Sequence, residues 1–241
     1  MAAVGWARDR ATYFYLGMAS IGVAAAAAGF STTYFIPLAT GRLAVPTIAH
    51  VHGLLFFSWV SLLVAQALLV RTKRTGLHRR IGWVAPPLAV AMAASGVGVG
   101  LHAVGRDLAV IGEASYSQLI GVLTSMTFLL AYVGIAIAMR KRPDWHKRMI
   151  LLATIAILWP AWFRFRHFMP WVPKPEIWLA IVLADSLIVA AMIRDKLALG
   201  RVHPAYWIFG SALIAEHVLE AIFYDTAPWR GSAKAIYLAL T

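Results

Sequence analysis

The sequence predicts an all-α integral membrane protein, a bundle of seven transmembrane helices. Of its 241 residues, 61% are hydrophobic and only 13% are charged, whereas soluble domains are about half apolar and about 25% charged. The apolar residues also gather into seven stretches long enough to cross a bilayer core of about 30 Å, which takes about 20 helical residues. A water-soluble globule is therefore excluded.

The seven predicted spans follow one another closely. They lie near 12–35, 46–70, 80–102, 116–139, 147–167, 175–194 and 203–224. The first is too long for a signal-peptide core and shows no small-residue cleavage site, so we expect it to be retained. The connections are short, and none of them separates two domains. We therefore expect residues 1–241 to form a single transmembrane helical domain.

Proline, glycine and basic residues mark the ends of the first four spans. The first connection runs from Pro37 to Pro46, the second is the basic stretch 71–80, and the third is 105–115. Small residues inside the first and third spans, at 24–29 and 96–100, predict surfaces where helices pack closely.

The fifth and sixth spans each carry a distinctive residue, one helix-breaking and the other polar, and a short segment follows the seventh span. Pro160 predicts a kink in the fifth span. Asp185 lies near the middle of the sixth, which suggests either a proton or cation relay or a buried hydrogen-bonding group. The segment after Pro228 is too short to span, so we expect it at the outer interface or over the mouth of the bundle.

Positive charge sets the predicted orientation. The chain has 22 Lys and Arg against 10 Asp and Glu, for a net charge of +12. Fifteen of the basic residues lie on the face that holds the amino terminus and seven lie on the other face. Because cytoplasmic loops are enriched in Lys and Arg, the amino terminus is predicted in the cytoplasm and the carboxyl terminus outside. The excess thus reports membrane topology, and no nucleic-acid partner is expected.

Several kinds of site are excluded or disfavoured by composition. The chain has no cysteine, which excludes disulfides, thiolate metal sites, iron–sulfur clusters, covalent c-type haem and a cysteine nucleophile. No lysine lies inside the last span, so a retinal Schiff base is excluded. The His-x-x-x-His pair of seven-helix zinc hydrolases is missing as well, which disfavours that class without excluding scattered ligands.

Eight histidines sort by depth under this topology. His78, His146 and His203 begin helices at the cytoplasmic face, where they are either interfacial and capping residues or ligands of an inner haem. The other five fall in the outer half: His50, His52, His102, His167 and His217. His50 and His52 are about 200° apart around their helix, so one of them faces any given site. We prefer His52 and keep His50 as the alternative.

Other ionisable residues are predicted near the outer histidines. Glu216, His217 and Glu220 lie along one side of the seventh span. Because ionisable groups are costly inside a bilayer, they normally face the bundle interior and have partners. Arg164 and Arg166 stand on the face where the charge rule disfavours them. Two interpretations stay open, namely structural ion pairs between these arginines and the two glutamates, or a site for a metal, a haem or an anionic substrate.

Two segments carry a family resemblance. They are HVHGLLFFSWVSLLVAQALLV, which leads on to GLHRRIGW, and RPDWHKRMILLATIAIL. Both resemble uncharacterised bacterial multi-helix membrane proteins with cytochrome-b561-like haem-binding histidine motifs. The resemblance covers about a third of the chain, and it implies His52 (or His50), His78 and His146 as ligands. It also implies a multi-pass protein of the bacterial inner membrane.

We therefore expect a protein that binds haem b, or another histidine-ligated metal, and serves electron transfer or a redox reaction. His52 and His217 are the predicted metal ligands, and His50 and His167 are further candidate cofactor contacts. Arg164 together with His167 would position propionates or an anionic substrate.

The catalytic candidates are Asp185, Glu216 and Glu220, which would orient ligands or move protons. The expected partners are the lipid bilayer and a redox partner in the membrane or periplasm. The alternative is a cofactor-free transporter, or an accessory subunit of a larger membrane complex, in which the same polar residues line a path or bind a protein.

Overall fold

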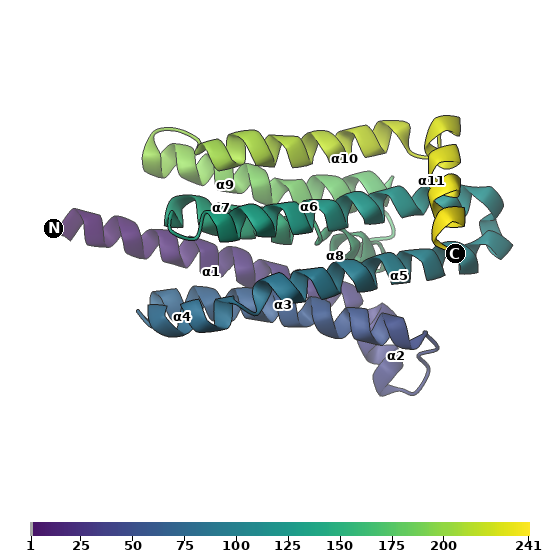
Figure 1. Cartoon of the computed structure of the whole chain (residues 1–241), viewed down its shortest axis with the longest axis horizontal. Coiled ribbons are helices and arrows are strands. Elements are labelled where there is room, and N and C mark those ends of the chain that lie inside the picture. Colours follow the sequence, from purple (N-terminus) through teal and green to yellow (C-terminus); the bar gives the residue numbers. More distant parts are fainter. Residues whose placement is uncertain (1) are drawn as a thin grey trace.

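The computed structural model describes the backbone of residues 2–241 and the side chains of residues 12–241. Within residues 2–241 the chain is helical and contains no strand. Most of the long helices run lengthwise, roughly parallel or antiparallel to one another, and α10, α6, α5 and α3 follow from top to bottom in Figure 1. The all-α prediction is confirmed.

The chain consists of α-helices with short π-helical and 3-10-helical segments between some of them. In chain order they are α1 (Ala2–Phe30), η1 (Ser31–Phe35), α2 (Ile36–Ala39), α3 (Thr47–Arg71), α4 (Thr75–Gly82), α5 (Ala85–Ile111), η2 (Gly112–Ser117), α6 (Gln118–Ala138), α7 (Pro143–Ile155), α8 (Trp159–Phe163), η3 (Arg164–His167), η4 (Glu176–Val182), α9 (Leu183–Leu199), η5 (Tyr206–Gly210), α10 (Ser211–Phe223) and α11 (Ala227–Leu240).

Six helical stretches of residues 12–241 are long and apolar enough to cross a membrane. They are Thr12–Ala39, Thr47–Arg71, Thr75–Ala138, Pro143–His167, Glu176–Leu199 and Tyr206–Phe223. The longest contains both α5 and α6, which fold back on each other through η2 and lie side by side (Figure 1). A multi-pass membrane protein is thus supported, while the count of seven crossings and the orientation stay predictions.

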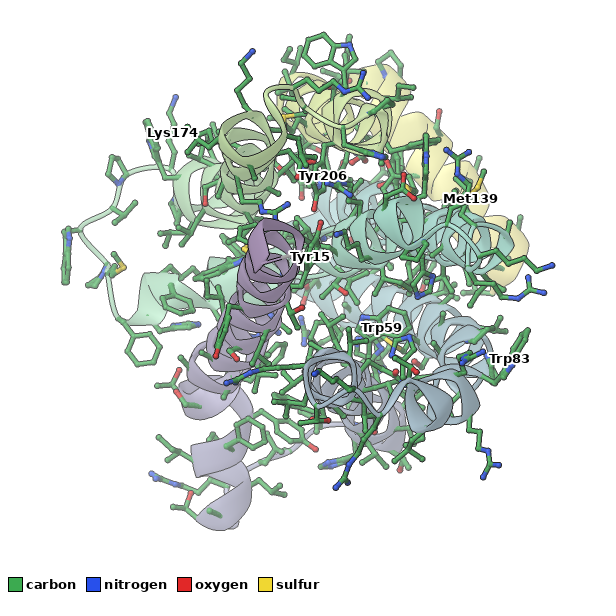
Figure 2. The ribbon with its side chains drawn as sticks, turned by 90° about the vertical axis from the view of Figure 1, so that its left-hand side faces the viewer. Tyr15, Trp59, Trp83, Met139, Lys174 and Tyr206 are labelled. Carbon is green, nitrogen blue, oxygen red and sulfur yellow. The ribbon has the colours of Figure 1, made fainter. Side chains whose placement is uncertain are left out.

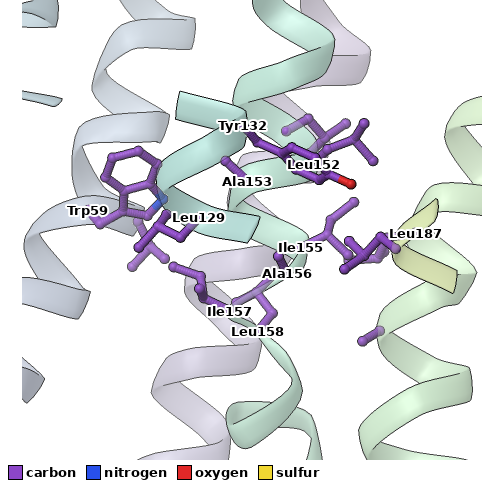
Figure 3. Packing of buried hydrophobic residues seen from close by; sticks show 14 of the residues in the cluster. Trp59, Leu129, Tyr132, Leu152, Ala153, Ile155, Ala156, Ile157, Leu158 and Leu187 are labelled. Carbon is purple, nitrogen blue, oxygen red and sulfur yellow. The ribbon is translucent and has the colours of Figure 1, made fainter. Parts of the chain in front are cut away.

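The core is centred on α7. Leu152, Ala153, Ile155 and Ala156 at the carboxyl end of this helix are fully buried. Figure 3 shows them packed between Trp59 of α3 and Leu187 of α9. Long apolar side chains elsewhere face outward, as they do on a protein whose solvent is lipid.

The break predicted at Pro160 is present. Helix α7 ends at Ile155, and α8 begins at Trp159 with the proline in its first turn. A proline has no backbone N–H and its ring clashes with the preceding turn, so a continuous helix is interrupted there. The interruption carries Arg164 toward α1 and α3.

Small residues let the helices approach closely, as the sequence predicts. A Cβ on Gly29 of α1 would stand 2.2 Å from the backbone oxygen of Ala161 in α8. On α5, Gly96 and Gly100 face Met126 and Val122 of α6, with virtual Cβ contacts of 2.8 and 3.2 Å. These contacts set the helix spacing around the cavity described below.

Helix α11 crosses one end of the bundle, where it runs almost at right angles to the long helices (Figure 1). It packs on η2, and its Ala233 is fully buried beside Tyr116. Asp225, just before α11, accepts hydrogen bonds from Ser117 Oγ and from the Arg230 guanidinium at 2.7–2.8 Å. The segment after Pro228 therefore covers this end of the bundle.

Candidate functional site

A cavity of about 620 Å³ opens between α1, α3, α5, α6 and α8, toward the end of the bundle that carries α2 and η2. Aromatic side chains form much of its wall, including Phe30, Phe56 and Trp159. The ionisable residues that line it are His52, His102, Arg106, Asp107, Arg164 and Arg166. The cavity thus combines apolar walls with imidazole and guanidinium groups.

His52 of α3 presents a free ring nitrogen to this cavity. Its Nδ1 lies 3.1 Å from Ser95 Oγ, and the single hydroxyl proton of Ser95 is donated to the Met92 carbonyl at 3.0 Å. In this arrangement the Ser95 oxygen accepts from His52, and a neutral ring carries its proton on Nδ1. Nε2 keeps its lone pair, and it makes no hydrogen bond to any described side chain. An imidazole held in this way can ligate a metal or accept a proton.

Arg164 lies at the same cavity without a carboxylate partner. Its Nη1 donates to the Pro160 carbonyl at 2.8 Å, its Nε donates to Thr33 Oγ1 at 3.2 Å, and the guanidinium lies 4.0 Å from the Phe30 ring centroid. Arg166 donates to the Phe163 carbonyl and stacks on the Phe163 ring. Among residues 12–241, neither arginine forms an ion pair.

Of the two interpretations left open, the ion pairs of Arg164 and Arg166 with Glu216 and Glu220 are therefore not formed among residues 12–241. Glu220 lies against Gly121 of α6, where an added Cβ would stand 2.2 Å from its Oε1. Glu216 lies beside His217. Both arginines instead line the cavity, and Arg164 contacts Phe30 of α1 and Thr33 of η1.

The predicted outer site divides into two. His52 lines the cavity, whereas His217 of α10 is buried elsewhere, with its Nδ1 2.8 Å from Asp185 Oδ1 of α9. Helices α3 and α10 lie at opposite edges of the bundle, with α5 and α6 between them (Figure 1). The structure therefore does not bring His52 and His217 to a common metal. Within residues 12–241, no group of three or more His, Asp or Glu side chains is arranged to hold a metal ion.

His50 and His167 are not among the residues that line the cavity. The Nδ1 of His50 lies 2.7 Å from the hydroxyl of Tyr34, whereas His52 lines the cavity itself. His167 is exposed at the end of η3. His102, by contrast, lines the same cavity as His52. Sequence spacing did not indicate this shared location, because the two residues lie on different helices.

The inner histidines have structural partners. His203 Nδ1 accepts the backbone N–H of Ala205, and its Nε2 donates to Asp144 Oδ2, both at 3.1 Å. Burial lowers the pKa of His203, although its bond to Asp144 acts in the opposite direction. His146 donates from Nδ1 to the Ala136 carbonyl, and its ring centroid is 6.3 Å from that of His78. The capping interpretation thus holds for His203, and His78 and His146 are neighbours.

An ion pair that sequence analysis missed joins α7 to α9. Arg148 donates from Nε and Nη2 to the two carboxylate oxygens of Asp195 at 2.8 and 2.7 Å, with both side chains at most 2% exposed. Beside it, the hydroxyl groups of Tyr15 and Tyr206 are 3.2 Å apart, and Figure 2 shows the two tyrosines at the centre of this end of the bundle. Arg148 was counted only as a topological charge, since its partner is 47 residues away in the chain.

Comparison with family models, with curated proteins and with solved structures finds no match to this chain. The site is therefore interpreted from its own geometry.

Proposed function

We propose that the protein binds haem b in the cavity lined by His52 and serves electron transfer in a membrane. The observation that carries the proposal is the imidazole of His52, whose Nε2 keeps a lone pair at the wall of a cavity of about 620 Å³. Cavities of about 300–1,000 Å³ are typical of sites for small molecules and cofactors. A bound haem would supply one-electron chemistry.

The residues of the cavity fit the group that they would hold. His52 would hold the haem iron through Nε2, and Ser95 would fix the orientation of its ring, as outer hydrogen-bond partners of metal-ligating histidines do. Arg164 and Arg166, which have no carboxylate of their own among residues 12–241, would pair with propionates. His102 is the other histidine at this cavity.

The second candidate is a cofactor-free transporter or accessory subunit whose cavity binds another amphipathic anion. The free guanidinium donors and aromatic walls would suit a carboxylate or phosphate on an apolar body equally well.

We further propose seven crossings of a bacterial inner membrane, with the amino terminus in the cytoplasm and the α11 end outside. The support is the charge asymmetry of fifteen against seven, together with the fold-back of α5 and α6 inside one helical stretch. The cavity would then lie in the outer half, within reach of a redox partner in the membrane or periplasm.

The test is the haem content of the full chain purified in mild detergent from haem-replete cells. For the wild type we expect a Soret band whose intensity corresponds to about one haem per chain. We expect this band to be lost in His52→Ala. Ser95→Ala is expected to weaken haem affinity by about 10- to 100-fold, because it releases the ligand ring.

His167→Ala is the matched control, since this histidine is exposed and outside the cavity lining. A folded wild type without haem, or a His52→Ala variant that keeps all of it, would move the cofactor-free candidate ahead.

A further inference from the structure

A second buried polar cluster lies outside the lining of the cavity, between α9 and α10. It consists of Asp185, Glu216, His217 and Glu220, and we call it the Asp185–His217 cluster. His217 is 4% exposed and Asp185 is 7% exposed, and both lie in helical stretches long and apolar enough to span a bilayer. A polar group in such a place is costly unless its charge and hydrogen bonds are satisfied.

Negative charge dominates this cluster. Asp185, Glu216 and Glu220 are the charged groups that act on His217, and all three are acidic. The remaining titratable neighbour is Tyr132 of α6, which lies near Glu216 and donates its hydroxyl proton to the Phe209 carbonyl at 2.7 Å. Among residues 12–241, no Arg or Lys forms an ion pair with any of these carboxylates. Three ionised carboxylates would therefore face at most one positive charge, so proton uptake by the cluster relieves a large electrostatic cost.

The hydrogen bonds show where a proton can add. Asp185 Oδ1 lies 2.8 Å from His217 Nδ1, so an ionised Asp185 accepts the Nδ1 proton. This leaves the lone pair of a neutral ring on Nε2. The nearest carboxylate oxygen to Nε2 is Glu216 Oε2 at 3.7 Å, which is beyond hydrogen-bond range. Within residues 12–241, Nε2 thus makes no hydrogen bond, although its side chain is almost wholly buried.

A path from this nitrogen to the end of the helix follows from helical spacing. Glu220 lies one turn beyond Glu216 on the same side of α10, and Tyr224 follows one turn later, where α10 ends. The Glu220 carboxylate lies against Gly121 of α6, where an added Cβ would make the carboxylate shift. Tyr224 is 47% exposed. Carboxyl and hydroxyl groups thus lead from the buried imidazole to the surface at the α11 end.

We propose that the Asp185–His217 cluster is a reversible proton-binding site with access from the α11 end of the bundle. One proton from water adds to the Nε2 lone pair of His217, by way of the Glu220 and Glu216 carboxylates. An N–H bond forms, one O–H bond of a hydronium or carboxyl group breaks, and no electron is transferred. The imidazolium then stands between Asp185 and Glu216, and both of these carboxylates stabilise it. This site is separate from the cavity, so it does not depend on haem binding.

The experiment follows protonation directly in the full chain reconstituted in lipid nanodiscs. Nitrogen NMR of ¹⁵N-histidine-labelled protein between pH 4 and 9 reports the state of each ring, and His217→Asn assigns the relevant signal. We expect His217 to change from the Nδ1–H tautomer to imidazolium as pH falls. In Asp185→Asn the midpoint should move to lower pH by about 1 to 3 units, because a neighbouring negative charge is lost.

Two further variants keep the result decisive. Glu216→Gln should shift the midpoint in the same direction and serves if Asp185→Asn fails to fold. Glu113→Gln is the matched control, since this glutamate pairs with Lys234 on the surface, and it should leave the midpoint unchanged. A ring that stays in one protonation state across the whole range, or a midpoint that neither cluster variant moves, would overturn the proposal.

Discussion

The chemistry available to His52 depends on a single hydroxyl proton. When Ser95 donates its proton to the Met92 carbonyl, its oxygen accepts from His52 Nδ1, and this tautomer leaves Nε2 free. His217 shows the same logic with Asp185 as acceptor. Sequence spacing singled out His52, His217 and Asp185, but it could not identify their partners. A partner depends on how each helix is rotated about its own axis, and the hydropathy pattern does not specify that rotation.

The crossing of α1 and α8 leaves no room for a methyl group at Gly29. Gly29→Ala would place Cβ 2.2 Å from the Ala161 backbone oxygen, and backbone cannot move aside as a flexible side chain can. We expect this variant to lower the free energy of unfolding by about 1 to 3 kcal/mol, in the range found for overpacked cores. Thermal unfolding in detergent measures the loss.

Gly17→Ala is the matched control on the same helix. A Cβ on Gly17 would meet nothing within 4 Å, so this change should be neutral or slightly stabilising, since alanine favours a helix more than glycine. Equal melting temperatures for the two variants would argue against the close crossing of α1 and α8.

Helices α7 and α9 are joined by the buried Arg148–Asp195 pair. Asp195→Leu leaves Arg148 as an uncompensated buried charge, so it should destabilise the fold by about 3 to 5 kcal/mol. Arg148→Met should cost less, because Asp195 keeps its ion pair with Arg194 at 3.0 Å. The double variant should recover much of the Asp195→Leu loss, because the almost fully buried charge of Arg148 is removed as well and the charge that remains, on Arg194, is 18% exposed. Denaturant unfolding of the four proteins of this cycle gives the coupling, and simple additivity of the two losses would contradict the pairing.

Helix α11 is held by Asp225, and this anchor depends on pH. Arg230, together with Ser117, holds the pKa of Asp225 below its ordinary value. The contribution of such a group is fully present above the ordinary carboxyl pKa of about 3.9 and is lost as pH falls through the lowered value. We expect hydrogen exchange in residues 227–240 to rise at strongly acidic pH.

Asp225→Asn should produce the same loss of protection at neutral pH. Asn tolerates the positive φ of 60° at this position, so the substitution removes the charge without strain. Asp144→Asn, at the other end of the bundle, should leave α11 protected. Unchanged exchange of α11 in Asp225→Asn would show that apolar contacts alone hold the helix.

At the scale of the whole molecule, the length of the apolar stretches predicted where the helices lie, but it predicted few of the places where they are interrupted. The predicted spans overlap α1, α3, α5, α6, α7–α8, η4–α9 and η5–α10, because length and hydropathy alone define a segment that can cross a bilayer. The continuation of α5 to Ile111, beyond the predicted end at residue 102, was missed because polar residues at a membrane boundary do not end a helix. The π-helical segments that begin at Glu176 and Tyr206 were not predicted, because the hydropathy of a span does not distinguish a π-helix from an α-helix.

The orientation of the whole bundle is testable with reporter fusions. With the amino terminus in the cytoplasm and seven crossings, alkaline phosphatase fused after Thr241 should be active, and a green fluorescent protein at the same place should be dark. Fusions after residue 141, in the connection between α6 and α7, should show the reverse. Phosphatase activity at residue 141 together with fluorescence at residue 241 would invert every assignment of inner and outer ends.

The proposed haem site is tested most directly by an experimental density map of the protein purified from its own membrane. The account predicts a flat density in the cavity, bonded to His52 Nε2, with its anionic groups toward Arg164 and Arg166. An elongated density that leaves His52 uncoordinated, or a well-resolved cavity that holds only water, would contradict it.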